Sequence, residues 1–534
     1  MIWRRRVGWC TLAAIPLAVV AVFFVLPLGG MLHRGLWPEG HLDLGAVGDV
    51  LGRRRIRRVL WFTVWSSGLA TLITVLLGVP VAWVLYRLRF PGRGLLRVIV
   101  AVPFVLPTVV VGVAFRTLFV RSGPLGLLGL DGTSTAIVVV LVFFNIAVVV
   151  RTVGAAWAAL DRRTGEAAAG LGASRARVFA SITFPALRPA IVSSAVVVFL
   201  FCATAFGVVL TLGGLRYATI ETEIYLQTTQ FLDLRAAATL SLVQLLLVAV
   251  LLAMTSGVRP VASEAEFGAE HRPRARDSAL LVLTGAVAVF LAAPVVELVL
   301  RSVRRDGAWT SAAYRALGGQ VWSALRNSLT TALLATAASM ALALLASAVV
   351  SRTPRTRASR RALRALDAVF TLPLGVSAVT IGFGFLITLD HPPLDLRTSP
   401  VLVIVAQALV ALPLVLRVLT PPLRAVPQSL RDAAATLGAG PLRTFATVEL
   451  PLVRRPLLAG TGFAFAVCLG EFGATSFLAR PDRQTLPVLI YQYSARPGAE
   501  NFQIALAASV VLAAVTVAVM LGVERLRVPS LGAF

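Results

Sequence analysis

Apolar runs of about 20 residues alternate with short polar segments along the whole chain. A helix of about 20 apolar residues spans the hydrocarbon core of a bilayer, so each run predicts a transmembrane helix. Glycine and proline interrupt many runs, which is tolerated where neighbouring helices satisfy the backbone. The pattern predicts an all-α polytopic membrane protein with about twelve helices, six in each half, near residues 8–30, 60–86, 95–119, 135–159, 190–212, 236–257, 278–300, 327–350, 366–389, 400–420, 457–479 and 503–523.

A polar stretch between these runs occurs twice, and the two copies align without a gap. The first copy is Glu166-Ala167-Ala168-Ala169-Gly170-Leu171-Gly172, which runs on to Ile182-Thr183-Phe184-Pro185. The second is Asp432-Ala433-Ala434-Ala435-Thr436-Leu437-Gly438, which runs on to Val448-Glu449-Leu450-Pro451. The same offset of 266 residues pairs other positions: Pro107 with Pro373, Cys202 with Cys468, Phe206 with Phe472, Thr219 with Thr485 and Tyr225 with Tyr491.

An internal repeat in a polytopic chain is typical of transporters, whose pathway lies between the repeats. Because six is an even number, both halves enter the membrane in the same direction and form parallel repeats. We therefore predict a first half at 1–257, a cytoplasmic linker at 258–277 and a second half at 278–534, with the repeated loops at 161–189 and 424–456.

The composition agrees with a membrane protein and excludes two other classes. Hydrophobic residues make up 58% of the chain and charged residues 14%, against roughly 25% charged in an average globular domain. A net charge of +26 could suit a nucleic-acid partner. The arginines, however, are scattered through the loops between apolar runs, and this distribution disfavours such a partner. All 50 basic residues are arginine, so the chain has no phosphate-binding loop of the G-x-x-x-x-G-K type and is not expected to hydrolyse nucleotides.

The reactive side chains do not converge on a catalytic or metal site. Cys10, Cys202 and Cys468 lie in apolar runs, and the four histidines have no ligand spacing. We expect no cofactor or metal on this chain and no enzymatic activity.

The arginines also predict the orientation. They are more numerous in the segments that a cytoplasmic amino terminus places inside, and both repeated loops then lie in the cytoplasm. The first run follows Arg4–Arg6 without a convincing cleavage site, which favours a retained span over a signal peptide. The segment 52–58 disagrees, because its arginines would lie outside. It predicts either an interfacial helix that leads into the second span or an error in the first two spans.

Each repeated stretch reads as two short helices that meet at a glycine. Gly172 and Gly438 allow the bend, and Pro185 and Pro451 are expected to stop the second helix before the next span. Alanine on the exposed face allows a partner to approach closely. The alternative, an ordinary amphipathic connector, is disfavoured because two copies occur on the same predicted face.

This pattern, E/D-A-A-x-x-x-G, nine residues, then I/V-x-L/F-P, is similar to the EAA loop of permease subunits in binding-protein-dependent ABC importers. The resemblance implies that each loop docks into one of two copies of a cytoplasmic ABC ATPase, which would carry the ATP and Mg²⁺. It also implies a solute-binding protein outside the cell. Carried over by position, the ATPase-coupling residues are Glu166, Ala167, Ala168, Gly172 and Pro185, and Asp432, Ala433, Ala434, Gly438 and Pro451.

Further motifs resemble the thiamine and ferric-iron permeases of that superfamily. They are Thr211-Leu212-Gly213-Gly214, Thr219-Ile220-Glu221, Glu471-Phe472-Gly473 and Thr485-Leu486-Pro487. The substrate stays open between thiamine and ferric iron, with sulfate-type, polyamine or phosphonate-related cargo as further alternatives.

Four residues are candidates for the substrate pathway. Charges inside spans are costly and rare, so Glu471 in the eleventh predicted span either faces a central cavity that favours a cation or bonds to a neighbouring helix. Glu221, Tyr225 and Tyr491 lie in predicted outer segments. Two alternatives are open for these three residues: they contact a substrate or its binding protein, or they are solvated loop residues.

The sequence thus predicts the multi-pass permease of an ATP-driven importer in the bacterial cytoplasmic membrane, in contact with lipid and not with nucleic acid. An ion-gradient-driven secondary transporter with two six-helix halves is the alternative. The repeated loops favour the importer.

Overall fold

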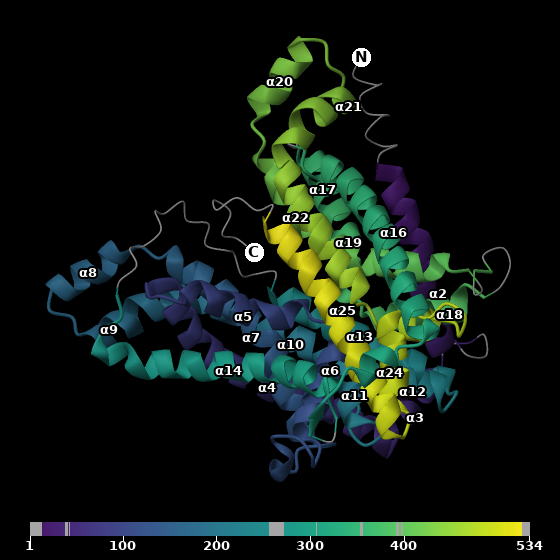
Figure 1. Ribbon diagram of the computed structural model, residues 1–534. Coiled ribbons are helices and arrows are strands. Elements are labelled where there is room, and N and C mark those ends of the chain that lie inside the picture. Colours follow the sequence, from purple (N-terminus) through teal and green to yellow (C-terminus); the bar gives the residue numbers. More distant parts are fainter. Residues whose placement is uncertain are drawn as a thin grey trace. The chain divides into compact units, whose positions relative to one another are not determined.

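The computed structural model describes residues 13–37, 41, 43–255, 272–305, 307–352, 356–390, 395–396 and 399–525 (Figure 1). The described chain is almost entirely helical, with one short antiparallel strand pair, β1 (Arg304–Arg305) and β2 (Ala308–Trp309). The helices are η1 (Ala21–Val25), α2 (Leu26–Leu36), α3 (Leu44–Gly52), α4 (Arg54–Arg87), α5 (Arg93–Val105), α6 (Thr108–Phe119), η2 (Gly126–Leu128), α7 (Ser134–Ala158), α8 (Arg162–Gly170), α9 (Arg175–Val178), η3 (Phe179–Thr183), α10 (Phe184–Ala203), α11 (Gly207–Gly213), α12 (Ile220–Thr229), α13 (Leu234–Thr255), η4 (Ala275–Asp277), α14 (Ser278–Ser302), α15 (Ala312–Arg315), α16 (Gly319–Val350), α17 (Arg357–Thr371), η5 (Leu372–Gly375), α18 (Ala378–Thr388), α19 (Val401–Ala425), α20 (Gln428–Thr436), α21 (Pro441–Thr444), η6 (Phe445–Glu449), α22 (Leu450–Leu469), α23 (Thr475–Leu478), α24 (Leu486–Ala495) and α25 (Ala499–Arg525).

Ten helices of the described chain are long and apolar enough to cross a membrane, which confirms an all-α polytopic membrane protein. They are Ala13–Leu36, Arg54–Arg87, Ser134–Ala158, Arg175–Ala203, Leu234–Met254, Ser278–Ser302, Gly319–Val350, Val401–Ala425, Leu442–Leu469 and Ala499–Gly522. The predicted number of about twelve is not confirmed, and both differences lie at the third span of a half.

A proline lies at the site of each difference. In the first half, α5 and α6 meet at 109°, and Pro107 lies at the break. A proline disfavours the helical region for the residue before it, and Leu106 is accordingly extended at φ −70° and ψ 137°. In the second half, the repeat-related Pro373 lies in η5, between the basic amphipathic α17 and the short apolar α18.

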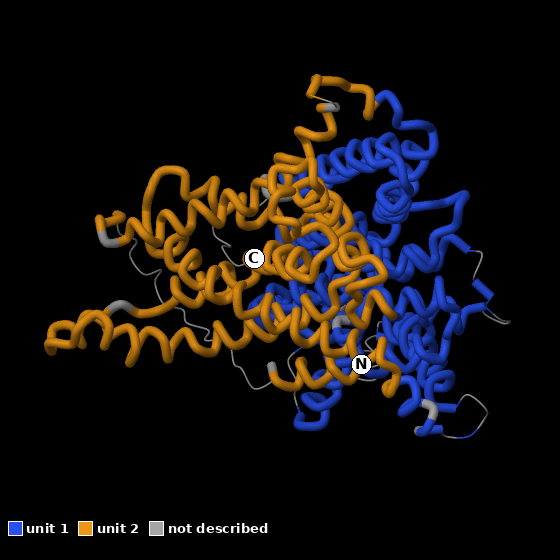
Figure 2. Tube along the Cα trace, turned by 90° about the horizontal axis from the view of Figure 1, so that it is seen from below, with its two compact units in different colours: residues 1–50, 224–245, 315–531 blue, residues 51–223, 246–314, 532–534 orange. Residues whose placement is uncertain are grey.

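The described chain forms two compact units that interleave along the sequence (Figure 2). Unit 1 contains residues 1–50, 224–245 and 315–531, and unit 2 contains 51–223, 246–314 and 532–534. The first span of the first predicted half therefore belongs to unit 1, which residues of the second half mostly form. The first span of the second predicted half belongs to unit 2, which residues of the first half mostly form. The division into halves at 257 and 278 remains a prediction about the repeat, and most of the predicted linker 258–277 lies outside the described residues.

Each unit contains the same three-helix arrangement. In unit 2, α4, α7 and α10 pack against one another, and α14 packs on α4, α5 and α6. In unit 1, the repeat-related α16, α19 and α22 pack against one another, and α2 packs on α18. Helix α4 begins directly in the arginine run, so this run forms the first turns of the second span's own helix.

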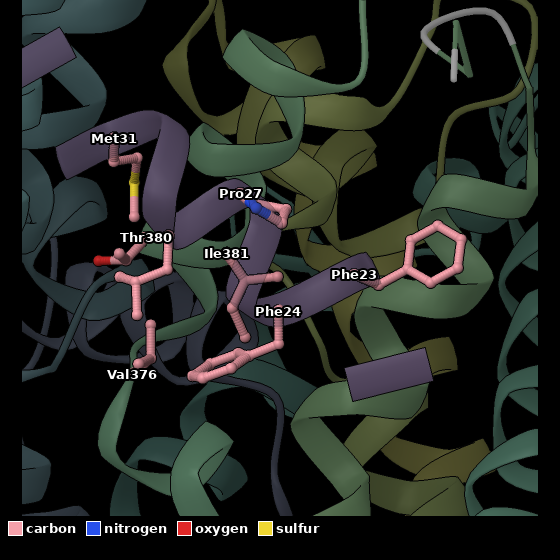
Figure 3. Close-up of a pocket in the computed structure, with 8 residues that line it drawn as sticks. Phe23, Phe24, Pro27, Met31, Val376, Thr380 and Ile381 are labelled. Carbon is pink, nitrogen blue, oxygen red and sulfur yellow. The ribbon is translucent and has the colours of Figure 1, made fainter. Parts of the chain in front are cut away.

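Small residues allow the close contact between the first span and α18. A Cβ atom on Gly384 would lie 3.0 Å from Pro27, and one on Gly30 would lie 2.6 Å from the Thr388 hydroxyl oxygen. Next to this contact is an apolar pocket, in which Phe24, Pro27 and Met31 face residues at the start of α18 (Figure 3). None of its eight lining residues is charged, so the pocket reads as a packing defect and not as a site for a cation.

Candidate functional site

The first repeated loop ends in a glycine turn with a defined hydrogen-bond pattern. Gly172 has a φ of +84°, which residues with a side chain rarely adopt. The Ala173 N–H donates to the Ala168 carbonyl at 3.0 Å, and the Gly172 N–H donates to the Ala169 carbonyl at 3.0 Å. This pair of bonds is a Schellman motif, which satisfies the last carbonyls of α8 and fixes the direction of the chain beyond it.

The second repeated loop has the same turn. Gly438 has a φ of +81°, the Ala439 N–H donates to the Ala434 carbonyl at 2.9 Å, and the Gly438 N–H donates to the Ala435 carbonyl at 3.1 Å. The predicted bend at each glycine is therefore present in both loops.

A leucine projects from each turn. Leu171 is 90% exposed and Leu437 is 88% exposed, although each lies in an otherwise polar stretch. The motif residues beside them, Glu166 and Asp432, are exposed as well. Each loop thus presents an acidic side chain and an apolar tip on a short rigid helix, a combination that suits insertion into a cleft of another protein.

The two prolines do not stop the second short helix, contrary to the prediction. Residues Phe179–Thr183 and Phe445–Glu449 form π-helical turns that continue directly into α10 and α22. The Phe184 N–H donates to Phe179 and the Leu450 N–H to Phe445, so the wider turn ends just before each proline. Pro185 and Pro451 then occupy the first turn of the next helix, where a missing N–H costs little. Each loop is therefore continuous with the fifth span of its half.

A buried ionic cluster lies beneath the second loop. Glu449 is fully buried, and its Oε1 accepts from Arg352 Nη1 at 2.8 Å and from Arg431 Nε at 3.1 Å. Arg431 also donates to the Leu423 carbonyl at 2.8 Å, and Arg352 donates to the Ala348 carbonyl at 2.9 Å. Burial lowers the pKa of Arg352, and the neighbouring Glu449 opposes this shift.

At the predicted outer side, matching hydroxyl groups anchor α12 and α24. The Ile220 N–H donates to the Thr63 hydroxyl at 3.0 Å within unit 2, and the Leu486 N–H donates to the Ser328 hydroxyl at 2.7 Å within unit 1. Figure 1 shows α24 toward the end of unit 1 that is opposite to α20 and α21. The repeat thus extends to the packing of these two short helices.

The two glutamates of α12 are buried, so the interpretation as solvated loop residues is wrong for Glu221. Glu223 accepts two hydrogen bonds from Arg55, at 2.6 Å to Nε and 2.8 Å to Nη2. One arginine of the run at 53–58 is therefore neutralised by an acidic residue far away in sequence.

Tyr225 and Tyr491 lie half-buried in an aromatic cluster of unit 1. Tyr225 packs edge-on against Phe477 with ring centroids 5.3 Å apart, and Tyr491 packs against Phe472 at 5.5 Å. Burial raises the pKa of Tyr225, and burial together with Tyr225 raises the pKa of Tyr491 to about 12. Both phenols are therefore neutral at physiological pH.

Glu471 lies two residues beyond the end of α22, so it is not part of the long helix that forms most of the eleventh predicted span. Its two carboxylate oxygens accept from the Ala474 N–H at 2.7 Å and the Thr475 N–H at 3.1 Å. The carboxylate therefore bonds to the following turn of its own chain. Its role in a substrate pathway stays a prediction.

Residues 74–259 and 343–527 match the family described as the inner membrane component of binding-protein-dependent transport systems. The chain belongs to this family. It is a multi-pass protein of the bacterial inner membrane with two copies of the family's domain in one chain.

Similar proteins cover this permease almost from end to end. The thiamine transport system permease protein ThiP of Brucella abortus is 28% identical over 91% of both chains. ThiP of Escherichia coli is 28% identical over 81% of this chain and 83% of its own. A probable ABC transporter permease protein of Sinorhizobium fredii, y4fN, is 26% identical over 97% and 96%. The permease thus resembles transport subunits that also carry both halves in one chain.

The sequence interpretation missed two features of this permease. One is the exposed leucine tip. The sequence does contain a simple signal for it, because a leucine precedes the bend glycine in both copies. The other is the ionic cluster, whose members Arg352, Arg431 and Glu449 are too far apart in sequence for a motif. Among the described residues, no group of three or more His, Cys, Asp or Glu side chains is arranged to hold a metal ion.

Proposed function

We propose that this chain is the membrane-spanning subunit of an ATP-driven importer that carries thiamine into the cell. Two copies of a cytoplasmic ABC ATPase dock on the repeated loops and hold the ATP and Mg²⁺, and a solute-binding protein delivers the substrate from outside. The chain itself carries no cofactor and performs no covalent chemistry. The observation that supports this function best is the pair of matched loops, each with a glycine turn and an exposed leucine.

The loops are built to pass on movement. Because each π-helical turn joins its loop to a long span, Arg175–Ala203 or Leu442–Leu469, a displacement of the loop is transmitted to that span without a flexible joint. Closure of two ATPase subunits would draw both loops with it. The helices they extend would then move, and the pathway would open alternately to the two sides of the membrane.

Thiamine is favoured over ferric iron for two reasons. The relatives that match most of the chain carry the name of a thiamine transport permease. In addition, the cluster of Tyr225, Phe472, Phe477 and Tyr491 offers aromatic faces, which attract organic cations and stack on flat heterocycles. Thiamine is a cationic molecule with two aromatic rings. Glu471 stands next to Phe472 and would add a negative charge near this route.

Reconstitution tests the whole proposal. The chain, its ATPase and its binding protein are placed in proteoliposomes, and uptake of radiolabelled thiamine is measured with ATP and with a non-hydrolysable analogue. We expect uptake only with ATP, and no competition by ferric ions. Uptake that ignores ATP but stops when the proton gradient collapses would support a secondary transporter instead.

The loops are tested with charged tips. Leu171→Arg and Leu437→Arg should each reduce the amount of ATPase that co-purifies with the chain, because a charge replaces the apolar tip. Leu127→Arg is the matched control, since Leu127 is a fully exposed leucine in η2, outside both loops. Equal ATPase recovery from all three variants would contradict the docking role.

A further inference from the structure

The two loops share their tips but differ in how they are attached. The second loop is connected to its unit through Arg431 on α20, Glu449 in η6 and Arg352 just beyond α16. A single carboxylate oxygen joins both guanidinium groups, at 2.8 and 3.1 Å. Through the bond from Arg431 to the Leu423 carbonyl, the cluster also reaches α19. One cluster therefore links the loop to two spans.

The first loop has no equivalent of this cluster at its repeat-related positions. Gly165 stands where the second loop has Arg431, and Thr183 stands where it has Glu449. Neither residue carries a charge. None of the described side chains of α8 is buried, whereas α20 buries Arg431 and Ala434.

Such a cluster fixes the orientation of the loop more than it adds to the net stability of the fold. A buried ion pair offsets much of its Coulomb energy by desolvation, yet it imposes a unique geometry. Arginine serves this purpose well because its planar fork holds several acceptors at once in fixed directions. Arg431 is 7% exposed and holds a carboxylate and a carbonyl together, so rotation of α20 would break both bonds.

We propose that Arg431 is a positioning residue that, through Glu449 and Arg352, fixes the second loop rigidly to α16 and α19. The related positions of the first loop hold Gly165 and Thr183, so two of the three members of this cluster are missing there. Because this inference rests on the proposed function for its consequence, the stroke of the ATPase on the second loop then reaches α16 and α19 through the cluster, in addition to α22 through the π-helical turn. The two ATPase sites would contribute unequally to transport.

Hydrogen exchange tests the attachment without any assumption about transport. On the purified full-length chain, we expect Arg431→Ala to speed the exchange of the α20 amides about tenfold, because local opening of α20 must break the cluster in the unmodified chain. The exchange of the α8 amides should not change. Arg431→Lys should retain part of the protection of α20, since lysine keeps the charge beside Glu449 but lacks the second arm. Unchanged exchange in Arg431→Ala would overturn the proposal.

A graft tests the same point by gain. The double variant Gly165→Arg and Thr183→Glu supplies the missing charges to the first loop. Arg87 already stands at the position related to Arg352, because the two halves align with an offset of 265 residues in this upstream part of the repeat. A Cβ on Gly165 would meet Val178 at 3.4 Å, an ordinary contact, so the backbone accepts the change. Exchange of α8 should slow in the double variant and not in Gly165→Arg alone. No slowing in the double variant would count against the cluster as the cause.

Coupling supplies the functional readout. In proteoliposomes with ATPase and binding protein, Arg431→Ala should lower the amount of substrate transported per ATP several-fold while basal ATP hydrolysis persists. Thr447→Ala is the control, because Thr447 is exposed in the same π-helical turn and bonds only to its own helix at Arg443. If the unmodified chain shows no ATP-driven transport, the proposed function fails and the exchange result still decides the attachment. If the unmodified chain shows ATP-driven transport and Arg431→Ala transports the same amount of substrate per ATP, the positioning role fails.

Discussion

The two repeated loops are alike at the tip and unlike at the base. Both turn at a left-handed glycine, expose a leucine and continue through a π-helical turn into a long span. Beneath the turn, the second loop is held by Arg431, Glu449 and Arg352, whereas the first has the uncharged Gly165 and Thr183 at the positions of Arg431 and Glu449. The comparison teaches that an exposed surface can repeat closely while the connection behind it changes. If the tips dock on a partner as proposed, that contact constrains the tip, whereas internal packing constrains the base.

The largest expected difference between the loops follows from removal of the buried carboxylate. Glu449→Ala leaves two guanidinium groups facing each other without a counter-charge, which costs about 3–5 kcal/mol. Thr183→Ala at the related position should cost at most about 0.5 kcal/mol. Thermal unfolding of the two purified variants measures the contrast. Similar losses in both would erase the proposed difference at the base.

The hydroxyl anchors of α12 and α24 should behave alike in the two units. Ser328→Ala and Thr63→Val each leave a buried N–H without its acceptor, at Leu486 and Ile220, and each should cost about 1–3 kcal/mol. The same unfolding assay applies. A loss of stability in only one of the two variants would show that the two anchors contribute less equally than their matching hydrogen bonds indicate.

The glycine turns should also respond equally. Gly172→Ala and Gly438→Ala place a side chain on a left-handed residue, which costs about 1–2 kcal/mol in either loop. No neighbouring atom lies within 4 Å of a Cβ at either position, so backbone conformation is the only penalty. Unequal unfolding temperatures for the two variants would mean that the base influences the turn.

The smallest effect on stability is expected at the tips. Leu171→Ala and Leu437→Ala remove side chains that are almost fully exposed, so unfolding should change by less than about 0.5 kcal/mol. ATPase recovery should nevertheless fall in both. A clear stability loss would indicate that the leucines pack within the chain instead of serving a partner.

Local features of the fold were predictable from the sequence. The apolar runs located the spans, because a bilayer demands about 20 apolar residues in succession. Gly172 and Gly438 predicted the turns, since the positive φ is available to glycine at little cost. The repeated prolines were visible too, but their effects were not: Pro107 and Pro373 break a span, whereas Pro185 and Pro451 fit into one.

Features that depend on distant residues were not predictable. Arg55 and Glu223 lie 168 residues apart, and Arg352 and Glu449 lie 97 apart, so no sequence window contains both partners. The run at 53–58 therefore looked like an orientation conflict, although Glu223 neutralises one of its arginines. Glu471 looked like a charge inside a span because the end of α22 is not marked by a proline or a charged segment.

The packing of the first span against α18 has a consequence for biogenesis. As the polypeptide leaves the ribosome, Ala13–Leu36 enters the bilayer long before residues 378–388 have been translated. Until then the part of this helix that α18 covers, at Pro27 and Gly30, is open to lipid or to helices inserted earlier. Translation in one continuous chain guarantees that the docking helix arrives, in the same membrane patch and in equal amount.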